Sequence, residues 1–180
     1  MKKLFLLLLV AFATLGMGMP LAQAGDSDTF SITITCNYID IVLQAYDGLS
    51  DYTTWAIGTQ VENTPTTMTE AQGIKVLNNA NMATDLSAWV STQAAAWTNA
   101  AAAGANQYKL EMKCFAGTQA TPDLSSATFT ITSTATPGND IKTNLAGNTP
   151  QWAYCKFTTP TSTTSGSQQT ITVTVLSQVA

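Results

Sequence analysis

Residues 29–36 read TFSITITC, and apolar and polar side chains alternate through the whole stretch. In an extended chain the aromatic, isoleucine and cysteine side chains fall on one face, and the hydroxyl side chains fall on the other. The same period of two recurs in residues 169–175 (QTITVTV) and 108–114 (YKLEMKC), where the second face carries hydroxyls or charges. Such alternation is typical of strands in sheets with one buried and one solvated face.

Shorter alternating runs at residues 128–132 and 153–157 extend this pattern along the chain. Turn-forming residues separate the runs. They are found at residues 47–48 (DG), 63–65 (NTP), 137–140 (PGND), 147–150 (GNTP) and 165–167 (SGS). Seven to nine short strands at this spacing predict an antiparallel β-sandwich.

Two stretches differ from the strand pattern. Residues 93–104 are rich in alanine but too short and too little amphipathic for a stable helix, so we expect a loop with one helical turn at most that returns Trp97 to the core. Residues 78–81 (NNAN) predict a tight turn between two strands.

The first 24 residues have the features of a secretory signal peptide. Two lysines precede an apolar run, and AQA at residues 22–24 is a small-residue cleavage site. A membrane anchor is the alternative, but Gly16, Gly18 and Pro20 interrupt the run before it can span a bilayer. We therefore expect a signal peptide at 1–24, a single domain at 25–180 with no membrane span, and a protein that is secreted or held at the bacterial cell surface.

The composition excludes several classes of chemistry. The chain of 180 residues has no histidine, and all seven of its basic residues are lysines. Catalytic triads that depend on histidine and imidazole metal sites are therefore excluded. After cleavage, five lysines stand against eleven acids, a net charge of −6 that disfavours nucleic acid as a partner.

The order of features resembles a secreted immunoglobulin-like β-sandwich domain of uncharacterised bacterial surface and extracellular proteins. The matching stretches are WAIG (55–58), IKVLNNAN (74–81), WT (97–98), AGANQYKL (103–110), FTTPT (157–161) and residues 168–175. Such domains usually carry a TNxGN turn, where this chain has Ala80 in place of glycine, so Asn79 or Asn81 would have to supply any left-handed residue. The resemblance implies a fold and a compartment, and it carries no catalytic residue.

The three cysteines lack the spacing of a metal or redox motif. Cys114 and Cys155 both fall on apolar faces of their runs, and in an exported protein the simplest expectation is a disulfide between them. It would close a loop of about 40 residues and stabilise the fold by roughly 3–4 kcal/mol. The alternative is that all three are buried thiols. With a disulfide formed, Cys36 would be either buried or bonded to another chain.

Aromatic residues suggest a possible binding face. If Cys155 faces inward, the alternation turns Trp152 and Tyr154 outward as an exposed pair. A carbohydrate-binding module would use such rings to stack on sugars. The alternative for the aromatics is that Trp55 and Trp97 fill the core.

The carboxylates give no metal or catalytic site. Asp40, Asp47 and Asp51 resemble a calcium loop only loosely, and their spacing fits no EF-hand. Nothing in the sequence brings two glutamates together as a glycosidase requires. We expect no cofactor, no metal and no catalytic residue.

These observations favour a non-enzymatic structural or adhesive protein of the cell surface, with a carbohydrate-binding module as the alternative. Residues 29–36 and 169–176 are the cleanest alternating runs, and neither contains a charge or a proline. Edge strands usually carry such residues as protection against pairing with another chain. We therefore expect the terminal strands to mediate self-association, the alternative being that both are central strands that are already fully paired.

Overall fold

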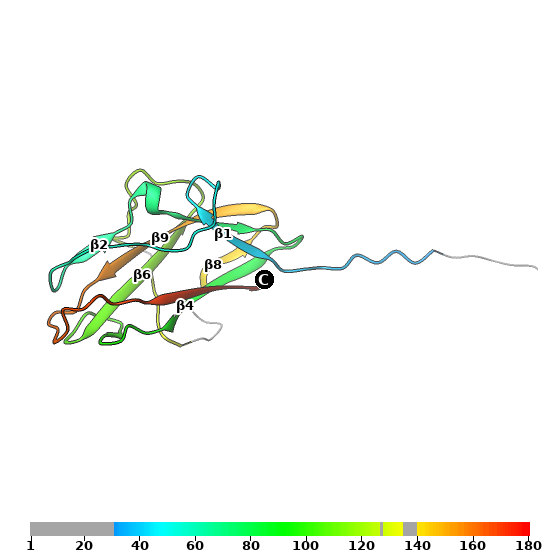
Figure 1. Ribbon diagram of the computed structural model, residues 1–180. Coiled ribbons are helices and arrows are strands. Elements are labelled where there is room, and N and C mark those ends of the chain that lie inside the picture. The colour runs from blue at the N-terminus through cyan, green and yellow to red at the C-terminus, as the bar shows by residue number, and fades with distance from the viewer. Residues whose placement is uncertain (1–30, 127, 135–139) are drawn as a thin grey trace, which may run out of the picture. The chain divides into compact units, whose positions relative to one another are not determined.

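The computed structural model describes residues 31–126, 128–134 and 140–180. The chain divides into two units, Met1–Thr35 and Cys36–Ala180. Both sheets belong to the second unit (Figure 1). The expected signal peptide, residues 1–24, lies outside the described residues.

The second unit is built from β-strands, as predicted. The strands are β1 (Ile41–Ala45), β2 (Pro65–Thr67), β3 (Ile74–Asn78), β4 (Thr84–Thr92), β5 (Thr98–Asn99), β6 (Gln107–Phe115), β7 (Phe129–Thr130), β8 (Asp140–Leu145), β9 (Thr149–Thr158) and β10 (Thr172–Val179). A 3-10 turn, η1 (Glu70–Gln72), is the one helical element within the described ranges. Ten strands exceed the expected seven to nine because β2, β5 and β7 are only two or three residues long.

The strands form two sheets packed as a β-sandwich (Figure 1). One sheet has the order β1-β3-β9-β6-β5, with β2 paired to β9 and β7 paired to β6. The other has the order β10-β4-β8. All pairings are antiparallel except that of β5 with β6.

The alternation in the sequence explains which side chains form the core. Leu86 and Val90 of β4 and Leu110 and Met112 of β6 are at most 4% exposed and belong to one buried cluster. Every second residue of a strand points to the same side, so each strand contributes one apolar face to the space between the sheets.

The asparagine-rich residues 78–81 form the expected turn from β3 to β4. The turn contains no left-handed residue at Asn79 or Asn81. The described asparagines with positive φ are Asn63, Asn106, Asn144 and Asn148. Instead, the buried Asn78 accepts a 3.0 Å hydrogen bond from the backbone N–H of Ala80 through its side-chain oxygen. This side-chain contact closes the turn, and no glycine is required.

The alanine-rich residues 93–104 form an irregular connection that includes the short β5. Trp97 returns toward the core, as expected. Its ring stacks on Phe157 with centroids 6.5 Å apart, and its indole N–H donates a 2.7 Å hydrogen bond to the Thr163 hydroxyl.

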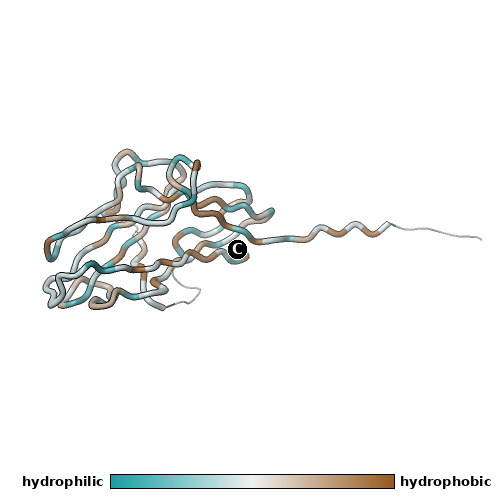
Figure 2. The backbone as a smooth tube through the Cα atoms, viewed as in Figure 1, coloured by the Kyte–Doolittle hydropathy of each residue, from teal (hydrophilic) through white to brown (hydrophobic). Residues whose placement is uncertain are grey.

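The expected N-terminal strand is not present as a strand. Residues 31–36 belong to no strand or helix, and residues 29–30 lie outside the described residues. Figure 2 shows apolar and polar positions alternating along the described part of this stretch. Within the described ranges, no helix combines the length and apolarity needed to cross a membrane.

Candidate functional site

Strand β10 forms an open edge of the smaller sheet. It is antiparallel to β4 from Val173↔Val90 to Val179↔Thr84, and in the described chain it pairs with no other strand. The expectation that this C-terminal run forms a strand is confirmed, although the strand begins at Thr172 and continues to Val179. The alternative that it is a central strand is wrong.

Hydrogen bonds at both ends of the pairing show which backbone groups face the open edge. The N–H of Ala180 donates to the carbonyl of Ala83, which makes that pair a hydrogen-bonded one. Hydrogen-bonded and non-hydrogen-bonded pairs alternate along an antiparallel ladder. The N–H of Val90 accordingly points away from β10 and donates to Thr132.

It follows that every second residue of β10 directs its N–H and C=O groups away from β4. These residues are Val173, Val175, Ser177 and Val179. They present four donors and four acceptors in the spacing that an added strand requires.

This edge lacks the features that protect edge strands. Residues 172–179 read TVTVLSQV, with no charge and no proline. The outer edge of the larger sheet differs, because residues 50–52 fold back over β1. There the N–H of Tyr52 donates to Leu43 and the N–H of Ala45 donates to Ser50.

The apolar side chains of β10 are only partly covered. Val173 and Val175 pack against the margin of the core but remain half-buried, whereas Leu176 and Val179 are 41% and 59% exposed. The valines are partly exposed because an edge strand has no neighbour to cover its flank, whereas Leu176 points to the opposite face of the sheet.

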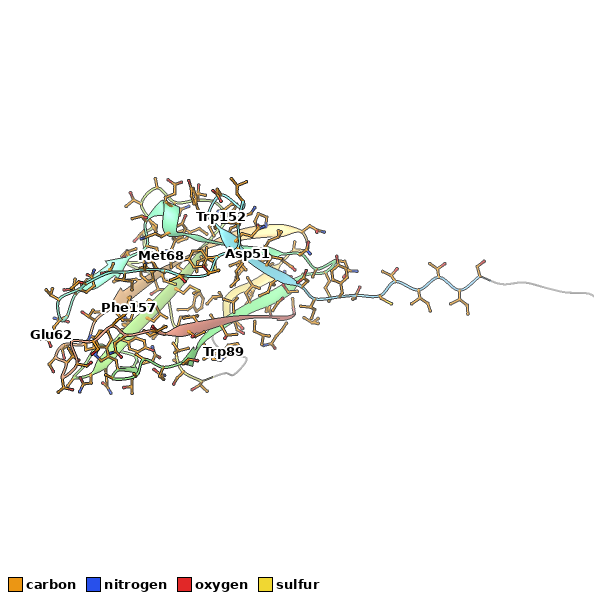
Figure 3. The ribbon with its side chains drawn as sticks, in the orientation of Figure 1. Asp51, Glu62, Met68, Trp89, Trp152 and Phe157 are labelled. Atoms are coloured by element: carbon orange, nitrogen blue, oxygen red, sulfur yellow. The ribbon has the colours of Figure 1, made fainter. Side chains whose placement is uncertain are left out.

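A second exposed feature lies before β1. Ile32 and Ile34 are 71% and 77% exposed, and residues 31–35 are drawn as an extended segment (Figure 3). The chain is held where the second unit begins, because the side chain of Asn81 donates to the carbonyl of Cys36 and accepts from the N–H of Tyr38, both at 3.0 Å. No pattern in the sequence predicted this attachment by Asn81.

The expected aromatic binding face is absent. Trp152 is half-buried, and its indole N–H donates a 2.9 Å hydrogen bond to the carbonyl of Tyr46 (Figure 3). Tyr154 is fully buried. The expectation that Trp152 and Tyr154 form an exposed pair is therefore wrong.

Tyr154 is buried because a further layer of chain covers the outer face of β9. A side-chain carbon at Gly73 would lie 2.6 Å from the Tyr154 ring, so only glycine allows this close approach. The Tyr154 hydroxyl accepts a 2.9 Å hydrogen bond from the N–H of Gln119, and Phe115 packs edge-on against the ring. The sequence carried a signal for this, since residues 151–155 (QWAYC) are apolar on both faces, as in a strand covered on both sides.

The expected Cys114–Cys155 disulfide is not formed, and all three cysteines are free thiols. The register explains the difference. Cys114 lies opposite Ala153 and Cys155 lies opposite Met112, so the two cysteines are diagonal neighbours. Diagonal positions have Cα atoms about 7–8 Å apart, which is too far for a disulfide. Burial raises the pKa of both thiols to about 12.

One carboxylate is enclosed by lysines on the outer face of the larger sheet. Glu111 of β6 lies 2.9 Å from the ammonium of Lys109 and 3.8 Å from that of Lys156, and it accepts a 3.1 Å hydrogen bond from the Thr128 hydroxyl. Burial alone would raise the pKa of Glu111. The hydrogen bonds from Lys109 and Thr128 and the charges of Lys109 and Lys156 outweigh this effect, so the pKa lies below its ordinary value. Through Lys156, Glu111 adds a side-chain contact between β6 and β9 to the backbone pairing of these two strands.

The other acidic residues of the described ranges do not gather into a metal site. Asp40 accepts a hydrogen bond from Asn79, and Asp47 accepts one from the N–H of Leu49. Within the described ranges, no three potential ligands of the histidine, cysteine, aspartate or glutamate type come together.

No protein-family model, no curated protein and no solved structure matches this chain.

Proposed function

We propose that this chain is an exported, non-enzymatic structural or adhesive protein of the bacterial cell surface, and that its copies associate through the open edge of β10. Export is supported by the lysine, apolar and AQA pattern of residues 1–24. The lack of histidine supports a non-enzymatic role. The two-sheet arrangement is compatible with the immunoglobulin-like sandwich that we propose for the domain.

The open edge of β10 is the observation that carries this proposal. An eight-residue strand without charge or proline presents unpaired backbone groups, and exposed regular edges of this kind pair with strands of other chains. A protein selected to remain monomeric would be expected to interrupt such a strand. Carbohydrate binding, the alternative, has lost its main support because Tyr154 is buried.

Ser177 offers a matched pair of variants for the test. Its N–H faces the open edge, and its buried hydroxyl has no hydrogen-bond partner. Ser177→Pro removes the N–H that an added strand would use and leaves the pairing with β4 intact. Ser177→Ala removes the same hydroxyl but keeps the N–H.

Sedimentation of residues 25–180 over a range of concentrations tests the proposal. We expect the wild type and Ser177→Ala to associate, and Ser177→Pro to remain a folded monomer. A wild type that is monomeric at high concentration, or a Ser177→Pro variant that is folded and associates unchanged, would contradict it.

A further inference from the structure

We propose that residues 31–36 of one copy form the strand that adds to β10 of a second copy. This inference rests on the proposed function, since it requires association at the β10 edge, and it goes further by naming the segment that occupies that edge. The occupant is a second copy of this chain, so association needs no other protein.

The chemistry of the segment fits the edge. Residues 31–36 read SITITC and share with β10 an alternating pattern of β-branched residues without charge. Isoleucine and threonine are among the residues that favour strands. Within its own chain the segment belongs to no strand, and Ile32 and Ile34 are 71% and 77% exposed.

The placement of the apolar side chains also fits. Val173 and Val175 project inward from the last strand of the smaller sheet and remain half-buried. A strand added beside them with Ile32 and Ile34 on the inner face would extend the apolar layer by one strand. It would cover both the exposed isoleucines and the flank of the valines, and Thr33 and Thr35 would face solvent.

The attachment at Asn81 fixes where the segment ends. Because Cys36 and Tyr38 are hydrogen-bonded to the Asn81 side chain, the residues before Cys36 are those left to reach another molecule. The contact joins two different surfaces, a segment on one copy and an edge on the other. Contacts of this kind build open chains of subunits, unless two copies exchange segments reciprocally.

Two classes of variant separate the two surfaces. Ile32→Asp/Ile34→Asp disables the segment and leaves β10 intact, and Ser177→Pro does the reverse. Thr33→Asp/Thr35→Asp is the matched control, because it adds the same two charges to the opposite face of the segment. Should Ser177→Pro fail to fold by circular dichroism, Thr174→Lys/Leu176→Lys provides a second disabled edge.

The test mixes the two disabled variants of residues 25–180 and measures mass by sedimentation. We expect each alone to be monomeric, with association weakened at least 100-fold, and the mixture to give a one-to-one heterodimer that grows no further. We expect Thr33→Asp/Thr35→Asp to associate within about tenfold of the wild type. A wild-type monomer would overturn both the proposed function and this inference. If Ile32→Asp/Ile34→Asp associates as the wild type does, or if the mixture stays monomeric, association uses another contact and this inference alone fails.

Discussion

The side-chain amide of Asn78 donates a 2.8 Å hydrogen bond to the carbonyl oxygen of Leu145, and this bond joins the two sheets. Asn78 ends β3 in the larger sheet, and Leu145 ends β8 in the smaller one. The same amide also contacts the carbonyls of Met82 and Ala146, at 3.0 and 3.2 Å, and the side-chain oxygen accepts from Ala80. One buried residue thus satisfies backbone groups from both connections at this end of the sandwich.

We expect Asn78→Ala to lower the free energy of unfolding by about 2–4 kcal/mol, because several buried backbone groups lose their partner at once. Urea denaturation measures this. Asn79→Ala is the control, since the Asn79 side chain is exposed and bonds only to Asp40; it should cost less than about 1 kcal/mol. Equal losses of unfolding free energy in the two variants would show that the hydrogen bonds of Asn78 do not hold the two sheets together.

Gly147 occupies the same corner, and its lack of a side chain allows a close approach. A side-chain carbon there would lie 2.6 Å from the backbone carbonyl of Ala80, which cannot easily move. We expect Gly147→Ala to destabilise the fold by about 1–3 kcal/mol. Gly166→Ala, where the added carbon meets nothing within 4 Å, should be close to neutral. Thermal melts of the two variants measure the difference. The reverse order would contradict this account.

Of the alternating runs identified in the sequence, those at residues 108–114, 128–132, 153–157 and 169–175 overlap with β6, β7, β9 and β10. β4 was not among them, although it has one apolar face and pairs with a strand on each side. β6 and β10 appear close to the expected positions because their alternation matches their burial or half-burial. Residues 31–36 alternate equally well and form no strand. The alternating pattern of a run predicts which face it would bury as a strand. Whether the run forms a strand depends on whether another strand is available to pair with it.

The candidate site could be predicted only in part for the same reason. The lack of charge in β10 was visible in the sequence, whereas its place at the sheet edge depends on topology. Tyr154 was assigned to the solvent side because a period of two distinguishes faces and cannot show that a second layer covers the outer one. The prediction of a disulfide between Cys114 and Cys155 was wrong because the register of β6 and β9 places the two cysteines two residues apart. The spacing of cysteines in the sequence does not reveal this register.

Glu111 should make the stability of the fold depend on acid. Its pKa in the folded protein lies below the ordinary value of 4.5, so its contribution is fully present above that value and is lost as the pH falls through the folded pKa. We expect Glu111→Gln to remove part of the loss of stability seen between neutral pH and pH values below about 4. Urea midpoints measured across this range test it.

Asp123 provides the comparison for Glu111, since the Ser125 hydroxyl and N–H lower the pKa of this exposed carboxylate as well. Asp123→Asn should change the acid dependence less, because solvent screens an exposed group. If the urea midpoints of Glu111→Gln fall with pH in parallel with those of the wild type, then Lys109 and Lys156 do not lower the pKa of Glu111 as described.

The three thiols should differ in reactivity, because one is exposed and two lie in the sandwich. Cys36 is exposed, whereas burial raises the pKa of Cys114 and Cys155 to about 12. The thiolate is the reacting form, so at pH 8 the two inner cysteines hold far less thiolate than an ordinary cysteine. Their position in the sandwich also limits access to a reagent.

We expect iodoacetamide to modify one thiol rapidly in the folded protein and all three in urea, with mass spectrometry placing the fast label on Cys36. Cys36→Ser should abolish the fast phase and leave the stability unchanged. Rapid labelling of Cys155 in the folded state would show that β6 and β9 separate, since Cys155 is only 4% exposed and its backbone N–H bonds to the sulfur of Met68. A mass two units below that of three free thiols would instead reveal a disulfide, and the diagonal register of Cys114 and Cys155 would then have to shift.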